Sequence, residues 1–294
     1  GGNAAMFSLV SAVLLRPLPY PAADRLVRLT LFYPKGAVVA LQEQSRTMEV
    51  AGFNTDQEFN LTGQGEAVRL TDLKGGVADY QWSPDGARLV VVSHDPDPEE
   101  SKPDSLKNKN PKPIVIDRYA FKRDYAGYLN RLRDHLYVFD VASKKAEQLT
   151  SGDFDDRMPR WSPDGKRIAF VSSREGKDPD RENNSDIYVI DAAPGATPQR
   201  LTSWRGDDSE PAWSPDGKWI AYLQGSEPQL SAYSQDQIAV IPATGGTPRY
   251  LAPTLDRDVG DLTWTPDGRT IRFVLGDDRA VHLAAIPAEG GEVT

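Results

Sequence analysis

The 294-residue chain is long enough for one large domain or two of ordinary size. Its 34 basic and 43 acidic side chains leave a net charge of -9, which excludes a nucleic-acid binder that works by neutralising phosphates. Without cysteine there is no disulfide framework and no thiolate chemistry, and three widely spaced histidines do not predict a metal site. We therefore expect an acidic globular protein with no cofactor, no bound metal and no nucleic-acid partner.

The first 68 residues are predicted to form a short irregular or helical segment. Residues 4–15 are an apolar run of about twelve residues, whereas a helix that crosses a bilayer needs about 20. No basic residue precedes the run, as one would in a signal peptide. A membrane contact is therefore expected only if residues 1–15 belong to a longer membrane helix.

Two stretches of this segment carry a resemblance. Residues 7–27 (FSLVSAVLLRPLPYPAADRLV) and 59–70 (FNLTGQGEAVRL) resemble the end of the first membrane helix and the start of the periplasmic domain of MacB-like ABC-transporter permeases. The resemblance implies that residues 1–68 are a permease fragment in a chimeric chain, joined to the rest near Arg69-Leu70-Thr71. The alternative is that residues 1–68 are a divergent part of the repeat that follows.

A five-residue motif, Trp-Ser/Thr-Pro-Asp-Gly, occurs four times after residue 69. A Leu-Thr or Leu-Ala pair precedes each tryptophan by 12 or 13 residues, so two markers recur in register. Proline presets the backbone for a turn, and glycine accepts the exit geometry. The motif residues are Trp82, Pro84, Asp85, Gly86, Trp161, Pro163, Asp164, Gly165, Trp213, Pro215, Asp216, Gly217, Trp264, Pro266, Asp267 and Gly268.

The sequence around each motif predicts short strands. In the second repeat these are residues 158–162, 167–173, 187–192 and 199–202, which makes four antiparallel strands in about 50 residues. A repeated unit of that kind is typical of a propeller blade. The predicted fold of residues 69–294 is therefore all-β, an incomplete β-propeller of about four four-stranded blades, with the motif tryptophans packed between blades.

The last repeat ends at residues 291–294, where its fourth strand is expected to begin. An open ring leaves unpaired edges, so we expect this chain alone to associate or to be poorly soluble.

The first repeat contains an insertion at residues 94–113, which is proline-rich and charged and is expected to be a solvated loop. An apolar strand is expected at residues 114–116, followed by the basic and aromatic residues Arg118, Tyr119, Lys122 and Arg123. The third strand of this repeat is then expected at residues 135–141.

Residues 69–294 resemble the N-terminal β-propeller of prolyl oligopeptidase-family serine peptidases, in the acylaminoacyl-peptidase and dipeptidyl-peptidase-like branch. The stretches that carry the resemblance are 70–77 (LTDLKGGV), 113–129 (PIVIDRYAFKRDYAGYL), 149–156 (LTSGDFDD) and 172–186 (SSREGKDPDRENNSD). The tryptophan motif alone is less specific, because TolB-like propellers share it.

The resemblance implies a propeller that acts as a size filter over a C-terminal α/β-hydrolase domain, admitting short peptides. That catalytic domain, with its Gly-x-Ser-x-Gly elbow, is expected to be the missing partner, because no glycine in this chain is followed two residues later by serine. The chain by itself is therefore expected not to be a catalyst, although its parent protein is expected to be a serine peptidase.

Two interpretations of the basic and aromatic cluster are open. Arg118, Lys122 and Arg123, with Tyr119, are candidates to meet a peptide carboxylate by bidentate pairing. Alternatively, these cations pair with the acidic propeller surface. The aspartate clusters before the first strands of blades, Asp153, Asp155, Asp156, Asp207 and Asp208, are interpreted as turn carboxylates rather than calcium ligands, since the EF-hand spacing is missing.

Three functions compete on the sequence alone. They are a substrate-gating propeller of a serine exopeptidase, a TolB-like propeller that binds proteins, and a fragment of an ABC-transporter permease. The sequence assigns no compartment: the propeller fits the cytoplasm or the periplasm, and the permease-like segment, if genuine, the inner membrane.

Overall fold

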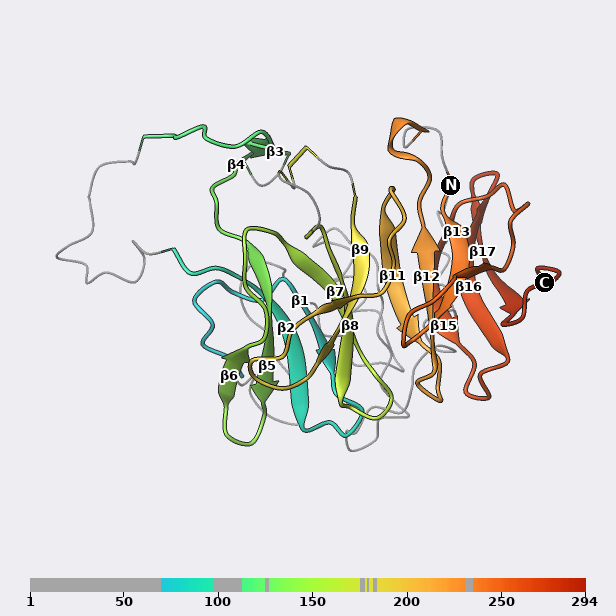
Figure 1. Cartoon of the computed structure of the whole chain (residues 1–294), viewed down its shortest axis with the longest axis horizontal. Coiled ribbons are helices and arrows are strands. Elements are labelled where there is room, and N and C mark those ends of the chain that lie inside the picture. Colours follow the sequence, from blue (N-terminus) through green and yellow to red (C-terminus); the bar gives the residue numbers. More distant parts are fainter. Residues whose placement is uncertain are drawn as a thin grey trace, which may run out of the picture. The chain divides into compact units, whose positions relative to one another are not determined.

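The computed structural model describes residues 70–97, 113–124, 127–174, 178, 180–181, 184–230 and 235–294. The predictions for residues 1–68 and for the centre of the insertion lie outside these residues. All strands of the described residues fall in one unit, Leu73–Thr294 (Figure 1). Within the described ranges no helix is long and apolar enough to cross a membrane.

The described chain is almost entirely β-structure, with seventeen strands and one 3-10 turn, η3 (Pro228–Leu230). The strands of the first sheet, in spatial order, are β1 (Asp79–Trp82), β2 (Arg88–His94), β5 (Asp134–Asp140) and β6 (Lys145–Gln148). Those of the second are β7 (Asp156–Trp161), β8 (Arg167–Ser172), β9 (Asp186–Asp191) and β10 (Gln199–Arg200).

The third and fourth sheets repeat the pattern. The third holds β11 (Asp208–Trp213), β12 (Trp219–Gln224), β13 (Gln237–Pro242) and β14 (Arg249–Tyr250). The fourth holds β15 (Val259–Trp264), β16 (Thr270–Asp277) and β17 (Ala280–Pro287), so three strands are assigned there instead of the expected four. Thr294 nevertheless exchanges two backbone hydrogen bonds with Ala285 of β17. This pair corresponds to the pair of Arg249 with Val240 in the third sheet, where Arg249 belongs to the fourth strand.

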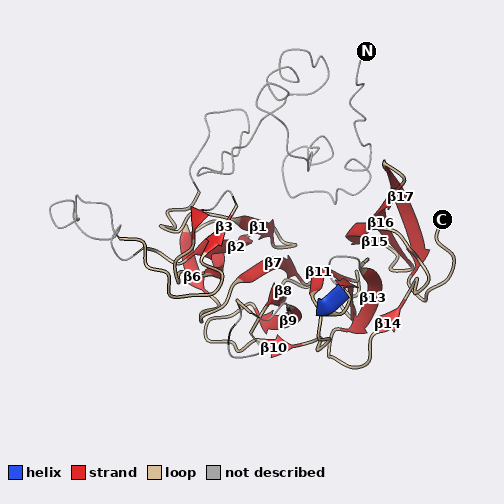
Figure 2. Ribbon diagram, turned by 90° about the horizontal axis from the view of Figure 1, so that it is seen from above, coloured by secondary structure: helices blue, strands red, loops and turns tan. Residues whose placement is uncertain are grey.

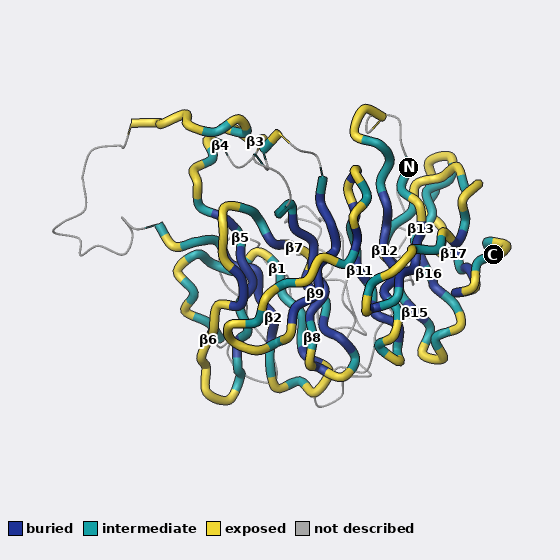
Figure 3. The backbone as a smooth tube through the Cα atoms, viewed as in Figure 1, coloured by how far each residue is buried: buried dark blue, intermediate teal, exposed yellow. Residues whose placement is uncertain are grey.

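The sheets follow one another along the chain and in space. Their first strands, β1, β7, β11 and β15, contact each other in that order, and Figure 2 shows the sheets along an arc. The core lies between sheets, because each buried cluster joins residues of two neighbours; one contains Val171 of the second sheet with Trp213 and Ile220 of the third. Figure 3 shows the central strands as the buried part of every sheet.

The repeated motif forms the turn between the first and second strand of each sheet. In the third sheet the Ser214 hydroxyl donates to Asp216 Oδ1 at 2.7 Å and accepts the Trp219 N–H at 2.9 Å, while Asp216 also accepts the Lys218 N–H at 3.1 Å. The other three turns have the same bonds, with threonine replacing serine in the last. The serine or threonine and the aspartate thereby satisfy the turn's backbone groups.

The glycine that ends each turn has a left-handed backbone, with φ of +69° at Gly217. We expect Gly217→Ala to lower the free energy of unfolding by about 1 kcal/mol, because a Cβ is disfavoured at this φ. Gly217→Asn is the matched control, since asparagine enters this region more readily, and it is expected to lose less. Thermal unfolding of both variants measures the difference, and equal losses would contradict a conformational origin.

The tryptophan of each of the last three motifs joins its sheet to the preceding one. The indole N–H of Trp213 donates to the Arg160 carbonyl at 3.0 Å, and that of Trp264 donates to the Ala212 carbonyl at 2.9 Å. Trp161 does the same to Gln81 at 3.2 Å. These three indoles are buried at the positions where the sequence expects packing between blades.

The apolar strand expected at residues 114–116 is a wrong prediction. Ile114, Val115 and Ile116 form no strand, and each is about 60% exposed or more. The physical reason is that β2 pairs directly with β5 from Arg88↔Asp140 to His94↔Asp134, so no strand can insert between β2 and β5. The segment leaves the sheet and carries only a two-stranded hairpin, β3 (Lys122–Arg123) with β4 (Gly127–Tyr128).

Candidate functional site

Charged residues gather at one edge of the sheets. There the second strand of each of the first three sheets ends and the long connection to its third strand begins, opposite the tryptophan turns. We call this edge the insertion face, formed in the first two sheets by residues 94–97, 113–124, 127–134, 153–156 and the described part of 172–186. The opposite edge, with the four turns, is the turn face.

We call residues 113–133, which leave the first sheet between β2 and β5, the excursion. Arg118 anchors this excursion to the second sheet. Its guanidinium binds Asp180 in a bidentate pair, with Nε donating at 2.8 Å, and Nη1 donates to the Asn130 carbonyl at 2.6 Å. Both side chains of the pair are more than nine-tenths buried. The guanidinium lowers the pKa of Asp180, and the carboxylate raises that of Arg118. The Arg118 guanidinium, a candidate to meet a peptide carboxylate, is thus occupied by Asp180. The alternative interpretation has these cations pair with acidic groups of the propeller surface.

The other three predicted substrate-binding residues lie beside this anchor and are exposed. The Tyr119 ring has the Arg181 guanidinium 4.4 Å from its centroid, and Lys122 lies 5.8 Å from the Tyr128 ring. Lys122 and Arg123 form β3, where both side chains face solvent. The structure therefore presents two cations and an aromatic ring at the surface, and their contact with a peptide stays a prediction.

The predicted acidic cluster meets a buried arginine. Arg133 Nε donates to Asp153 at 2.9 Å, and its Nη1 lies 3.8 Å from Asp155 and 3.6 Å from Asp180. Asp155 also accepts the Asp134 N–H at 3.1 Å. The carboxylates thus pair with a cation that sequence reasoning did not single out. In the loop at residues 178–184, where residues 178, 180–181 and 184 are described, Asp178 accepts the Asp180 N–H at 3.1 Å.

A buried ionic group lies between the first and second sheets. Asp156, fully buried at the start of β7, accepts two bonds of 2.9 Å from Arg174, and His135 Nδ1 lies 3.4 Å away. The Arg174 guanidinium also covers the Phe154 ring at 4.3 Å. His135 is therefore a packed residue of β5, whereas His282 is exposed on β17.

The next interface holds a carboxylate pair in the same place. Asp208 starts β11 as Asp156 starts β7, and Asp186 starts β9; both are fully buried. Arg200 lies 2.7 Å from Asp186, but neither Asp208 oxygen has a hydrogen bond in the described structure. Burial raises the pKa of Asp208 to about 7, and the charges of Asp186 and Asp207 add to this. Asp208 can therefore hold a proton near neutral pH.

The comparisons with known proteins agree with a peptidase propeller. No family model matches the chain. Dipeptidyl-peptidase 5 of Porphyromonas gingivalis is 31% identical over 136 residues, which is 45% of this chain and 19% of the relative. The uncharacterized peptidase YuxL of Bacillus subtilis is 32% identical over 136 residues, 44% of this chain and 20% of the relative. The chain spans about a fifth of the length of these curated relatives.

Solved structures share the fold. The acylaminoacyl peptidase of Pyrococcus horikoshii superposes with a TM-score of 0.57 at 17% identity, over 78% of this chain and 33% of that one. The putative TolB of Agrobacterium tumefaciens superposes with a TM-score of 0.51 at 20% identity, over 79% of this chain and 70% of that one. These relatives give no support to the permease resemblance of residues 1–68, which stays a prediction.

Proposed function

From the premise that this chain matches the β-propeller of a prolyl oligopeptidase-family peptidase, we propose that its four sheets are blades of a propeller that gates a serine exopeptidase. The observation that carries the proposal is the 31–32% identity to two peptidases over 136 residues each. The described part of the chain is almost entirely β-structure. The catalytic groups would belong to an α/β-hydrolase domain outside this chain, and the substrates would be short peptides.

An exposed apolar strip supports a partner domain. Ile114, Val115 and Ile116 are 61%, 67% and 60% exposed, and Tyr119 beside them is 63% exposed. Side chains of this size are seldom left in water as a contiguous strip, and such strips mark contact surfaces. We assign this strip to the contact with the hydrolase domain, at the insertion face that Arg118 and Asp180 hold in place.

The exposed cations of β3 supply the means to bind a peptide end. Lys122 and Arg123 lie next to the strip, and Arg118, which is neutralised by Asp180, does not compete for the ligand. A free carboxylate is the group on a short peptide that these cations would recognise.

The test of this assignment is peptide binding by the chain. Fluorescence anisotropy with a labelled tripeptide should show binding that weakens several-fold in the Lys122→Ala/Arg123→Ala double variant. The same peptide with a C-terminal amide should be insensitive to the substitutions. Because both side chains are exposed, the unfolding temperature should not change.

The matched control is the Lys144→Ala/Lys145→Ala double variant, which removes two exposed cations from the opposite edge of the first sheet. An equal loss in this control would show that the chain's overall charge, rather than β3, attracts the peptide. A chain that ignores short peptides but binds a folded protein would favour the TolB-like reading.

A second outcome concerns catalysis. The purified chain is expected not to cleave a dipeptide anilide, since it contains no Gly-x-Ser-x-Gly elbow. The measurement is anilide release compared with buffer. Release at an enzymatic rate that survives repurification would contradict a purely gating role for these residues.

A further inference from the structure

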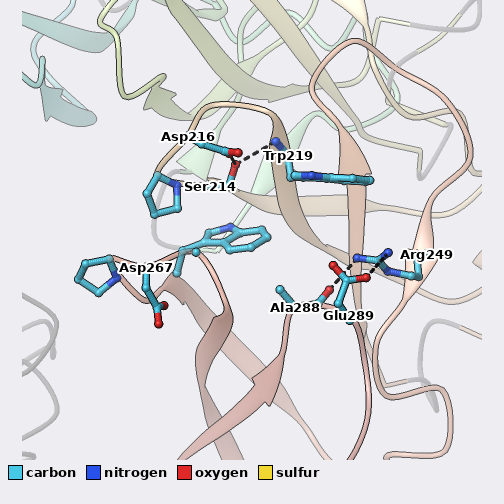
Figure 4. A pocket seen from close by; sticks show the side chains of 11 residues that line it. Ser214, Asp216, Trp219, Arg249, Asp267, Ala288 and Glu289 are labelled. Atoms are coloured by element: carbon cyan, nitrogen blue, oxygen red, sulfur yellow. Dashed lines mark hydrogen bonds and ion pairs between the residues drawn. The ribbon is translucent and has the colours of Figure 1, made fainter.

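A cavity lies between the third and fourth sheets on the turn face. Its volume is about 360 Å³, and it is lined by turn residues 214–216 and 266–268, by two indoles, and by the ion pair of Arg249 with Glu289 (Figure 4). The indoles belong to Trp219, which starts β12, and to Trp264, which ends β15. The cavity is at the opposite strand ends from the insertion face and is independent of the peptide contact proposed there.

The chain itself shows what occupies this place at the two preceding interfaces. The Arg88 guanidinium lies 4.7 Å from the centre of the Trp161 ring and donates to the Gly165 carbonyl at 2.7 Å. Arg167 lies 4.9 Å from the Trp213 ring and donates to the Gly217 carbonyl at 3.5 Å. An arginine of one sheet thus covers the tryptophan of the next and reaches the turn behind it.

The interface between the third and fourth sheets has the same backbone geometry as the two preceding interfaces. A Cβ placed on Gly165, Gly217 or Gly268 would in each case lie 3.7 Å from the Cδ atom of the proline in the preceding turn. The turns are therefore equally spaced at all three interfaces. What differs is the side chain six residues after the motif tryptophan, which is Arg88, then Arg167, and then Trp219.

Because tryptophan stands at position 219, the turn carbonyl and the indole that hold a guanidinium at the other interfaces have no arginine here, in the part of the chain that the structure describes. Within the described residues the Gly268 carbonyl accepts no arginine, and Trp264 is 9% exposed against 4% and 5% for the two covered indoles. Arg249 does not replace the missing group on Trp264, because its guanidinium lies 5.4 Å from the centre of the Trp219 ring, donates to the Ala288 carbonyl at 2.8 Å and pairs with Glu289 at 2.9 Å. Figure 4 shows that pair beside Ala288.

The charge of the lining favours a cation. Three carboxylates, Asp216, Asp267 and Glu289, and one guanidinium, Arg249, line the cavity, and Lys218 lies 3.5 Å from Asp216. The Ser214 and Thr265 hydroxyls lower the pKa of Asp216 and Asp267, which are therefore ionised at neutral pH. Indole faces attract guanidinium more strongly than other aromatic rings do.

We propose that this cavity binds the arginine side chain of a peptide, which takes the place that Arg88 and Arg167 fill at the two preceding interfaces. The guanidinium lies against Trp264 and donates to the Gly268 carbonyl. The carboxylates of the two turns compensate its charge. The volume exceeds that of a guanidinium alone and accommodates the arginine stem as well.

The test uses three small probes: N-acetyl-arginine methylamide and its lysine and leucine analogues. Tryptophan fluorescence of the chain is followed during titration with each. The arginine probe should bind about tenfold more tightly than the lysine probe, because only a planar guanidinium can both stack on an indole and donate to a carbonyl. Equal affinity for all three probes, or no binding of the arginine probe, would overturn the proposal.

The decisive variant is Trp219→Arg, which restores the arginine of the other interfaces. It should lower affinity for the arginine probe at least tenfold while leaving the unfolding temperature unchanged or higher. Unchanged affinity in a folded Trp219→Arg chain would refute the site. Arg167→Trp is the converse variant and should create a second arginine site on Trp213, seen as a doubled stoichiometry; a folded variant with unchanged stoichiometry would also refute it.

Discussion

At pH 7.5 the Asp208→Asn variant should be more stable than the natural chain by a few kcal/mol. Asp208 is fully buried, and neither of its oxygens has a hydrogen bond in the described structure, so ionisation there is costly. Its pKa of about 7 against an ordinary 3.8 corresponds to at most about 4 kcal/mol. Asparagine has the same shape and no charge to bury.

The sign of the pH dependence follows from the raised pKa. The folded chain binds the Asp208 proton more tightly than the unfolded chain, so this contribution to stability is complete below about pH 4 and is lost as the pH rises through 7. In the natural chain the Asp186 and Asp207 charges add to the effect of burial on the Asp208 pKa, whereas Thr202 and Arg200 oppose it. The gain in melting temperature from Asp208→Asn should therefore be smallest below about pH 4, grow as the pH rises and approach its full size above about pH 7.

Asp156→Asn is the matched control at the preceding interface. Asp156 accepts two bonds from Arg174 and faces His135, so its removal leaves a largely buried guanidinium without its anion. That variant should be destabilised by about 3 kcal/mol or more at pH 7.5. The fourth sheet has Val259 in this position, so Asp208→Val should also stabilise the chain. A lower stability of Asp208→Asn at pH 7.5 would contradict the inference that the buried Asp208 charge is not compensated by its surroundings.

The second large effect is expected at the anchor of the insertion face. Asp180→Ala removes the anion that holds the Arg118 fork, the Ala120 N–H and one contact of Arg133. Leaving a buried guanidinium unpaired costs about 3–5 kcal/mol. The cost falls on the excursion, because residues 113–133 leave the sheet. Trypsin should therefore cut at Lys122 and Arg123 much faster, with a small change in the global unfolding temperature.

Arg131→Ala controls for the loss of an ion pair alone. Arg131 pairs with Asp117 at 2.7 Å, but both side chains are about half exposed, and pairs this exposed to solvent contribute little to stability. Its cleavage rate at Lys122 and Arg123 should stay near that of the natural chain. Identical cleavage of all three proteins would show that the Arg118–Asp180 pair does not hold the excursion.

The repeat made the strands predictable. The tryptophan motif fixes a turn whose serine, aspartate and glycine have defined roles, so the strands of the second blade appear within about two residues of the predicted positions. Bulges in three first strands were not predicted. Met158, Glu210 and Asp261 adopt φ of +51°, +51° and +54° there, and none of them is a glycine that would have marked the position.

The site was less predictable because its contacts join distant segments. Arg118 and Asp180 lie 62 residues apart, in the connections of two different sheets. Nothing in the local sequence of either segment indicates that the two residues pair. The strand predicted at residues 114–116 failed for a related reason: local hydrophobicity indicates burial, but the edge that a strand would need is taken by β5. The vacant arginine position at Trp219 was visible only once Arg88 and Arg167 showed what the position holds.

The measurement that tests the gating function most directly is the dependence of binding on peptide length. Labelled peptides of the same C-terminal sequence, from about three to about thirty residues, are titrated into the chain at fixed ionic strength, with a folded protein carrying the same tail as the longest ligand. A propeller that filters substrates by size should bind the short peptides and lose affinity steadily as length and folded bulk increase. Affinity that rises with length, and is highest for the folded protein, would contradict the filter and identify these blades as a protein-binding surface.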